Sequence, residues 1–167
     1  MPKIIENLRH SLLCEAKRQI NERGYKNTTI RSVASGCGVA VGTVYNYFKS
    51  KDMLIASFVL DDWIGCLGRI SKYPKDNKYR YLAFIHESIC DFIKNNESLF
   101  YDKEAEHSFS LSAIKRHEQL RHQLAEQIMP IAGDDFLAEY VAEALLCWTA
   151  KGYDFDSVYP LLPEKIK

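Results

Sequence analysis

The sequence predicts an all-α protein in which an N-terminal three-helix domain precedes a helical bundle. Apolar residues recur at three- and four-residue steps through most of the chain, as they do along amphipathic helices. No segment shows the two-residue alternation of a half-buried strand. Glycine, proline and paired asparagines interrupt the apolar pattern where helices of ordinary length would end.

These interruptions define the expected elements in order. Gly24 caps the first helix, and the hydroxyl of Thr28 or Thr29 caps the second. Pro130 and Gly133 are expected to interrupt the chain before a last long helix. The expected helices span residues 4–23, 29–35, 41–47, 51 into the 60s, 79–94, 110–129 and 135–151, and a short helix follows near the C-terminus.

The second and third of these helices fit a helix-turn-helix. Two short helices that cross steeply need a small residue at their contact and a glycine in the turn between them. Ala34 and Gly38 are spaced for these two positions. Val33, Val39 and Val44 would then be buried at the corner, which leaves the other side of residues 41–47 exposed.

The exposed residues of the third helix suit contact with DNA in the major groove. Hydroxyl groups of threonine and tyrosine reach phosphates, asparagine bonds to base edges, and valine contacts the methyl group of thymine. Lysines follow directly and add positive charge near the backbone. The candidate DNA-binding residues are Val41, Gly42, Thr43, Tyr45, Asn46, Tyr47 and Lys51.

The distribution of charge separates this N-terminal part from the remainder. The chain has 22 basic and 22 acidic residues. Residues 1–51 contain nine bases and three acids, a net charge of +6, so the rest carries −6. A basic head on an acidic body is typical of a phosphate-binding module joined to one that does not bind DNA. We therefore predict a domain boundary between residues 51 and 52.

Residues 8–60 resemble the N-terminal domain of TetR-type repressors. The family pattern is close to TxxxIAxxAGVSxGTxYxYFxSKExL. The chain departs from it at Ala40, where the family has a hydroxyl residue, and at Cys37, where it has alanine. The matching residues are Thr29, Val33, Ala34, Gly38, Val39, Gly42, Thr43, Tyr45, Tyr47, Phe48, Ser50, Lys51 and Leu54.

The resemblance implies roles for individual residues. Those matching Thr43, Tyr45, Tyr47 and Lys51 hold phosphates in the family, and those matching Val41, Gly42 and Asn46 lie near bases. Ala40 lacks a hydroxyl that would cap the third helix, an interaction worth about 1 kcal/mol. We expect a less ordered recognition helix that still binds DNA.

The resemblance also implies that residues 52–167 form a helical effector-binding and dimerisation domain. A transcriptional repressor that leaves a palindromic operator when a small molecule binds, and that acts as a homodimer on double-stranded DNA, is the expected function. The residues proposed to line an effector pocket are Phe58, Trp63, Tyr81, Phe84, Phe92, Phe100, Tyr101 and Phe109. The proposed dimer contacts are Phe136, Tyr140, Ala144 and Trp148, with residues 114–128.

Other classes of function lack support in the sequence. There is no phosphate-binding glycine loop, nucleophile elbow or HExxH motif, so no enzyme and no cofactor are predicted. The apolar runs are too short to span a bilayer, and the N-terminus has no signal-peptide core, so a cytoplasmic protein without a membrane partner is expected. The alternative is a helical small-molecule-binding or interaction protein whose head no longer binds DNA specifically, an alternative that Ala40 favours.

The cysteines and histidines are interpreted as structural. Five cysteines without a CxxC pair predict reduced, mostly buried thiols. His86 and Cys90 lie one helical turn apart and are interpreted as a buried pair. His117 and His122 are expected to be solvated surface residues. No metal site is predicted.

Overall fold

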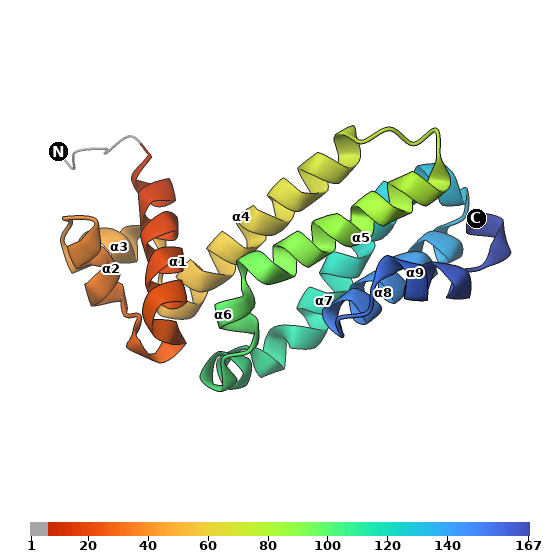
Figure 1. Ribbon diagram of the computed structural model, residues 1–167. Helices are drawn as coiled ribbons and strands as arrows, with labels where there is room; N and C mark the ends of the chain where they lie inside the picture. The colour runs from red at the N-terminus through yellow and green to blue at the C-terminus, as the bar shows by residue number, and fades with distance from the viewer. Residues whose placement is uncertain (1–6) are drawn as a thin grey trace. The chain divides into compact units, whose positions relative to one another are not determined.

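The computed structural model describes residues 7–167, and for residue 104 and residues 106–116 it describes the backbone only. All the regular secondary structure of this part of the chain is helical, and it has no strand (Figure 1). It divides into two compact units, one formed by residues 7–62 and 96–111 and the other by residues 63–95 and 112–167. The functional boundary expected after residue 51 stays a prediction.

The first unit contains the N-terminal helices α1 (Leu8–Asn27), α2 (Ile30–Gly36) and α3 (Val41–Tyr47). It also contains the first part of α4 (Lys51–Lys72), the short α6 (Glu97–Phe100) and the beginning of α7 (Lys103–Ala132). The apolar stripe expected on the first helix is buried from Leu8 to Ile20, and Leu12 and Ala16 are fully inaccessible. Residues 4–6 of that expected helix lie outside the described residues. This core fixes the positions of α2 and α3.

Helix α1 contains the break that Gly24 predicts. The helical assignment runs to Asn27, but Gly24 has φ +78° and ψ 172°, outside the helical region. Only glycine adopts this backbone conformation without strain. The chain therefore changes direction at Gly24, and buried Tyr25 follows directly.

The second unit is a bundle formed by the end of α4, α5 (Lys78–Asn95), most of α7 and α8 (Asp135–Ala150), with α9 (Phe155–Val158) beside it. Trp63 of α4 is fully buried, packs edge-on against Phe92 of α5, and donates from Nε1 to Gln123 of α7 at 2.9 Å. Tyr81 of α5 donates to the carbonyl oxygen of Gln127 at 2.8 Å. Two short 3-10 turns, Tyr159–Leu161 and Glu164–Ile166, complete the described chain.

Helix α7 differs from the expectation at both ends. It begins at Lys103 and continues through Pro130 to Ala132. Proline removes one helical hydrogen bond, but Ile128 and Ala132 on either side are buried, and their packing offsets that loss. Gly133, with φ +68°, ends the helix. The expected interruption at Pro130 is therefore wrong.

The expectation of mostly buried cysteines is also wrong. Cys66 is buried, Cys37 and Cys147 are partly buried, and Cys14 and Cys90 are exposed. The two exposed thiols lie on the outward faces of α1 and α5, so position on an amphipathic helix outweighs the burial tendency of the residue type. None of the helices in residues 7–167 is both long and apolar enough to cross a membrane.

Candidate nucleic-acid interface

A reciprocal pair of hydrogen bonds begins α2. Thr29 is the N-cap residue, and its hydroxyl accepts from the backbone N–H of Ser32 at 3.0 Å. The hydroxyl of Ser32 accepts in return from the backbone N–H of Thr29 at 3.0 Å. This capping box satisfies two N–H groups that the helix leaves unpaired, and it selects Thr29 over Thr28 as the cap.

A buried glutamine joins α1 to α2. Gln19 is 1% exposed, its amide nitrogen donates to the carbonyl oxygen of Ser32 at 3.0 Å, and its amide oxygen accepts from the Ser32 hydroxyl at 2.6 Å. The same amide nitrogen donates to Glu15 at 2.6 Å. The helices approach so closely here that a Cβ on Gly36 would lie 2.6 Å from Cδ of Glu15. The network holds α2 against α1.

Glu15 is also paired with an arginine on its own helix. Arg18 donates to both carboxylate oxygens, at 2.7 and 2.8 Å. These hydrogen bonds, with a smaller one from Gln19, lower the pKa of Glu15 from 4.5 to about 2, against the opposing effect of burial. The carboxylate therefore keeps its charge to a lower pH than an ordinary glutamate does.

The turn between α2 and α3 has the predicted small residues at its centre. Ala34 is 1% exposed, and its carbonyl oxygen accepts from the N–H of Val39 at 3.0 Å. Gly38 has φ +66°, a conformation that residues with a Cβ rarely adopt. The turn thus uses both residues that the sequence assigned to it.

Helix α3 is anchored by two residues and exposes the rest of its surface. Val44 is fully buried and Phe48, directly after the helix, is 3% exposed. Tyr45, Asn46 and Tyr47 are exposed, as is Gly42, whereas Val41 and Thr43 are partly buried. The six candidate residues on α3 therefore share one short helix, and four of them are open to solvent.

The start of α3 lacks a side-chain cap. Ala40 is the N-cap residue, has extended backbone angles of φ −67° and ψ 146°, and offers no oxygen to the first turn. The N–H of Thr43 is bonded to the carbonyl oxygen of Ala40 at 2.9 Å instead. The absence of a hydroxyl cap agrees with the sequence interpretation.

The two lysines after α3 differ in their surroundings. Lys51 is partly buried, and its ammonium lies 3.6 Å from the centre of the Tyr25 ring and donates to the Tyr25 carbonyl oxygen at 2.9 Å. Lys49 is exposed and donates to the carbonyl oxygen of Tyr45 at 3.2 Å. The side chain of Lys49 therefore reaches the exposed residues of α3, whereas that of Lys51 points to α1.

Two exposed cations on or directly beside α2 and α3 are not among the seven candidate residues, although one of them, Lys49, was expected to add positive charge near the DNA backbone. They are Lys49 and Arg31, which lies on the first turn of α2. The net charge of +6 in residues 1–51 was the available signal, but it does not show which cations are exposed. The structure shows that both side chains are exposed.

Residues 12–58 match the model of the bacterial regulatory proteins of the tetR family. The N-terminal part of the chain is therefore similar to the corresponding domain of tetR-family regulators. The HTH-type transcriptional regulator HbdR of Aromatoleum sp. (strain CIB) is 37% identical over 54 residues, which are 32% of this chain and 24% of HbdR. The HTH-type transcriptional repressor KstR2 of Mycolicibacterium smegmatis is 36% identical over 58 residues, 34% of this chain and 28% of KstR2. The match thus spans less than a third of either relative.

The likeness in fold extends beyond the TetR-type domain. The fatty acid degradation regulator FadR from Bacillus halodurans superposes with a TM-score of 0.60, over 95% of this chain and 94% of FadR. The two sequences are 18% identical, so this comparison shows a common helical fold and no more.

The aromatic residues proposed for an effector pocket fall into both units. In the second unit, Trp63, Tyr81 and Phe92 are buried, and Phe84 stacks on Tyr73 with ring centres 4.1 Å apart. In the first unit, Phe58 is buried, whereas Phe100 and Tyr101 are 44% and 69% exposed. Phe109 lies outside the residues whose side chains are described. The pocket stays a prediction.

The residues proposed for the dimer contact lie on α8. Phe136, Tyr140 and Trp148 are exposed, and Ala144 is partly buried. The opposite side of the helix packs into the bundle through Leu137, Val141 and Leu145. Of residues 114–128, the first three lie outside the described side chains. The interface also stays a prediction.

Proposed function

We propose that the protein is a transcriptional regulator that binds a DNA operator through α3 as part of a homodimer. The observation that carries the proposal is the surface of α3, where Tyr45, Asn46 and Tyr47 are exposed on a helix that Val44 and Phe48 anchor. A helix presented in this way by a helix-turn-helix fits the major groove. Its residue types supply both phosphate contacts and base contacts.

The homodimer follows from the way such domains read DNA. Paired helix-turn-helix units bind half-sites about one helical turn apart, which requires two-fold symmetry in the protein. Phe136 is 80% exposed and Tyr140 48% exposed on α8, so this helix has apolar surface to offer a second copy. A palindromic operator is the expected partner.

Repression relieved by a small-molecule effector completes the proposal. The names of HbdR and KstR2 describe a regulator and a repressor. Helix α4 has residues in both units. An effector that changes the conformation of the second unit could therefore act on the first unit through this helix. An effector that binds tightly without changing DNA affinity would contradict this step.

Selection of bound sequences from a random duplex library tests DNA recognition. We expect the wild-type protein to enrich a palindrome and Tyr47→Ala to lose that enrichment. Tyr153→Ala is the matched control, because Tyr153 is 51% exposed and lies in the second unit. Affinity should fall steeply with salt, as phosphate contacts require.

Failure of the wild-type protein to enrich any sequence would overturn this function. The result would favour the alternative, a helical binding protein whose head no longer binds DNA specifically. The uncapped start of α3 is consistent with that alternative. Measurement of molecular mass in solution tests the dimer separately. A monomer at the concentrations used for DNA binding would contradict the proposed symmetry.

A further inference from the structure

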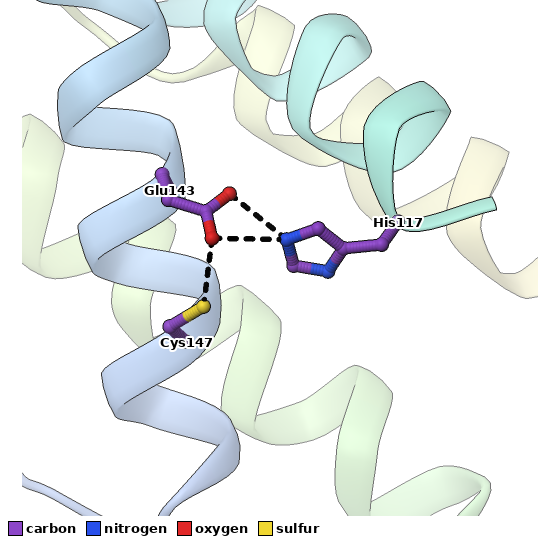
Figure 2. Close-up of side chains that lie close together, drawn as sticks. All are labelled: His117, Glu143 and Cys147. Carbon is purple, nitrogen blue, oxygen red and sulfur yellow. Dashed lines mark hydrogen bonds and ion pairs between the residues drawn. The ribbon is translucent and has the colours of Figure 1, made fainter. Parts of the chain in front are cut away.

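Three metal-binding side chains meet between α7 and α8 in the second unit. His117 projects from α7, and Glu143 and Cys147 project from α8 one turn apart (Figure 2). Their ligand atoms all lie within 4.8 Å of one another. Among the side chains that the structure describes, this group is the one with three such ligands in reach.

The contacts within this group are short. Nε2 of His117 lies 2.8 and 3.1 Å from the two carboxylate oxygens of Glu143. The thiol of Cys147 donates to Oε1 of Glu143 at 3.0 Å. Ligand atoms on one tetrahedral zinc ion are separated by about 3.5 Å, given bonds of about 2.0–2.3 Å. Shifts of about 1 Å would therefore place all three around one ion.

Two further residues hold the helices in register at this point. Arg121 donates to Glu139 at 2.7 Å, and Nδ1 of His122 lies 2.9 Å from the same carboxylate. These ion pairs join α7 to α8 one turn from Glu143 and so pre-position His117. Nη1 of Arg121 also lies 3.7 Å from Oε2 of Glu143. A metal ion bound to Glu143 would therefore lie near this positive charge.

The second unit also contains a histidine and cysteine pair that lacks this geometry. Nδ1 of His86 lies 3.7 Å from Sγ of Cys90 on the same helix, and Nε2 of His86 is bonded to the carbonyl oxygen of Tyr153 at 2.9 Å. His86 is buried as expected, but Cys90 is exposed. This pair is a natural control for the group at His117.

We propose that Nε2 of His117, one carboxylate oxygen of Glu143 and Sγ of Cys147 bind a zinc ion, with a fourth position left to water. One imidazole, one carboxylate and one thiolate form a donor set that suits zinc, whereas calcium and magnesium prefer oxygen ligands alone. On binding, the Cys147 thiol loses its proton to solvent and becomes a thiolate. The ion would then join α7 to α8.

No short sequence motif indicates this site, and the expectation of no metal was based on residue spacing. His117 and Glu143 are separated by 26 residues and by the turn at Gly133, so no short motif contains them. The side chain of His117 is 43% exposed, in agreement with the expected surface position, and it also pairs with Glu143 across the two helices. The inference concerns the second unit alone and does not depend on DNA binding.

Metal titration of the reduced full-length chain tests the proposal. The metal-free protein is titrated with zinc against a chromogenic chelator, and with cobalt to record the thiolate-to-metal charge-transfer band. We expect one metal per chain and a clear charge-transfer band. Cys147→Ser should abolish the band. Loss of a residue that only supports a metal ligand usually weakens metal binding about 10- to 100-fold. Cys147→Ser and His117→Gln each remove a ligand, so both should weaken zinc binding by more than that.

Cys90→Ser is the matched control for Cys147→Ser, since it removes a thiol of the same unit that is outside the group. It should keep the band and the affinity of the wild type. Wild-type protein without stoichiometric zinc binding, or a band that survives Cys147→Ser but disappears in Cys90→Ser, would overturn the proposal. Half a metal ion per chain would also overturn it, because that ratio indicates a site shared between copies.

Discussion

Gln19 and Ser32 exchange two hydrogen bonds across the contact between α1 and α2, one through the Ser32 hydroxyl and one through its carbonyl oxygen. Gln19 occupies a position on the otherwise apolar stripe of α1 and is 1% exposed. A buried amide with its partners in place fixes how two helices meet, because any other arrangement leaves polar groups unpaired.

Replacement of Gln19 by leucine should destabilise the first unit. The change keeps the volume but leaves the Ser32 carbonyl oxygen without its donor, at a cost of about 1–3 kcal/mol in the free energy of unfolding. Urea unfolding followed by circular dichroism measures this loss. Ser35→Ala, an exposed position on α2, should stay within about 0.5 kcal/mol of wild type. Equal stability of the two variants would show that the network contributes nothing.

Glu15 should make the first unit sensitive to acid. Its pKa is lowered to about 2 by Arg18, so its contribution is complete above the ordinary value of 4.5 and disappears as the pH falls from 4.5 toward 2. Glu15→Gln should cost about 1 kcal/mol at neutral pH, a modest value because Arg18 is half exposed. The difference between variant and wild type should vanish near pH 2. A difference that is independent of pH would assign the effect to packing.

Introduction of a hydroxyl at position 40 should order the recognition helix. Ala40 already has the extended backbone angles of an N-cap residue, so Ala40→Ser requires no rearrangement. We expect about 0.5–1 kcal/mol of added stability and tighter DNA binding. Ala40→Val is the comparison without a hydroxyl, because valine is as poor an N-cap residue as alanine. If serine and valine act alike, the cap is not the cause.

The two lysines after α3 should separate DNA binding from folding. Lys49→Gln should leave unfolding unchanged and reduce the slope of log affinity against log salt by about 1, as loss of one phosphate contact does. Lys51→Gln should lower the free energy of unfolding by about 1 kcal/mol, since Lys51 bonds to Tyr25. Binding measured over a series of salt concentrations, with urea unfolding of both variants, distinguishes these outcomes. The opposite pattern would assign the phosphate contact to Lys51.

The sequence predicted the elements whose signals are local. Helix α3 has the expected bounds of 41–47, because Gly38 and the residues around it specify the turn within a few positions. Of the three valines expected at the corner, Val33 and Val44 are buried for the same reason, whereas Val39 is only partly buried. The DNA contacts assigned to α3 remain predictions, although its exposed surface is consistent with them.

Features that depend on distant residues were not predictable in this way. The role of Gln19 depends on a partner 13 residues away, and the group around His117 depends on a separate helix. Pro130 reads locally as an interruption, but the buried residues beside it keep α7 helical. Intrinsic helix propensity is a weak guide where tertiary packing decides whether a segment is helical.

The burial of Trp63 has a practical consequence for spectroscopy. The chain has two tryptophans, Trp63 and Trp148, and both belong to the second unit, while the TetR-type domain has tyrosine and phenylalanine alone. Fluorescence excited at the red edge of the indole band therefore follows the second unit only. If the N-terminal domain unfolds first, this emission stays unchanged while the helical ellipticity falls. If the two units unfold together, both signals change over the same range.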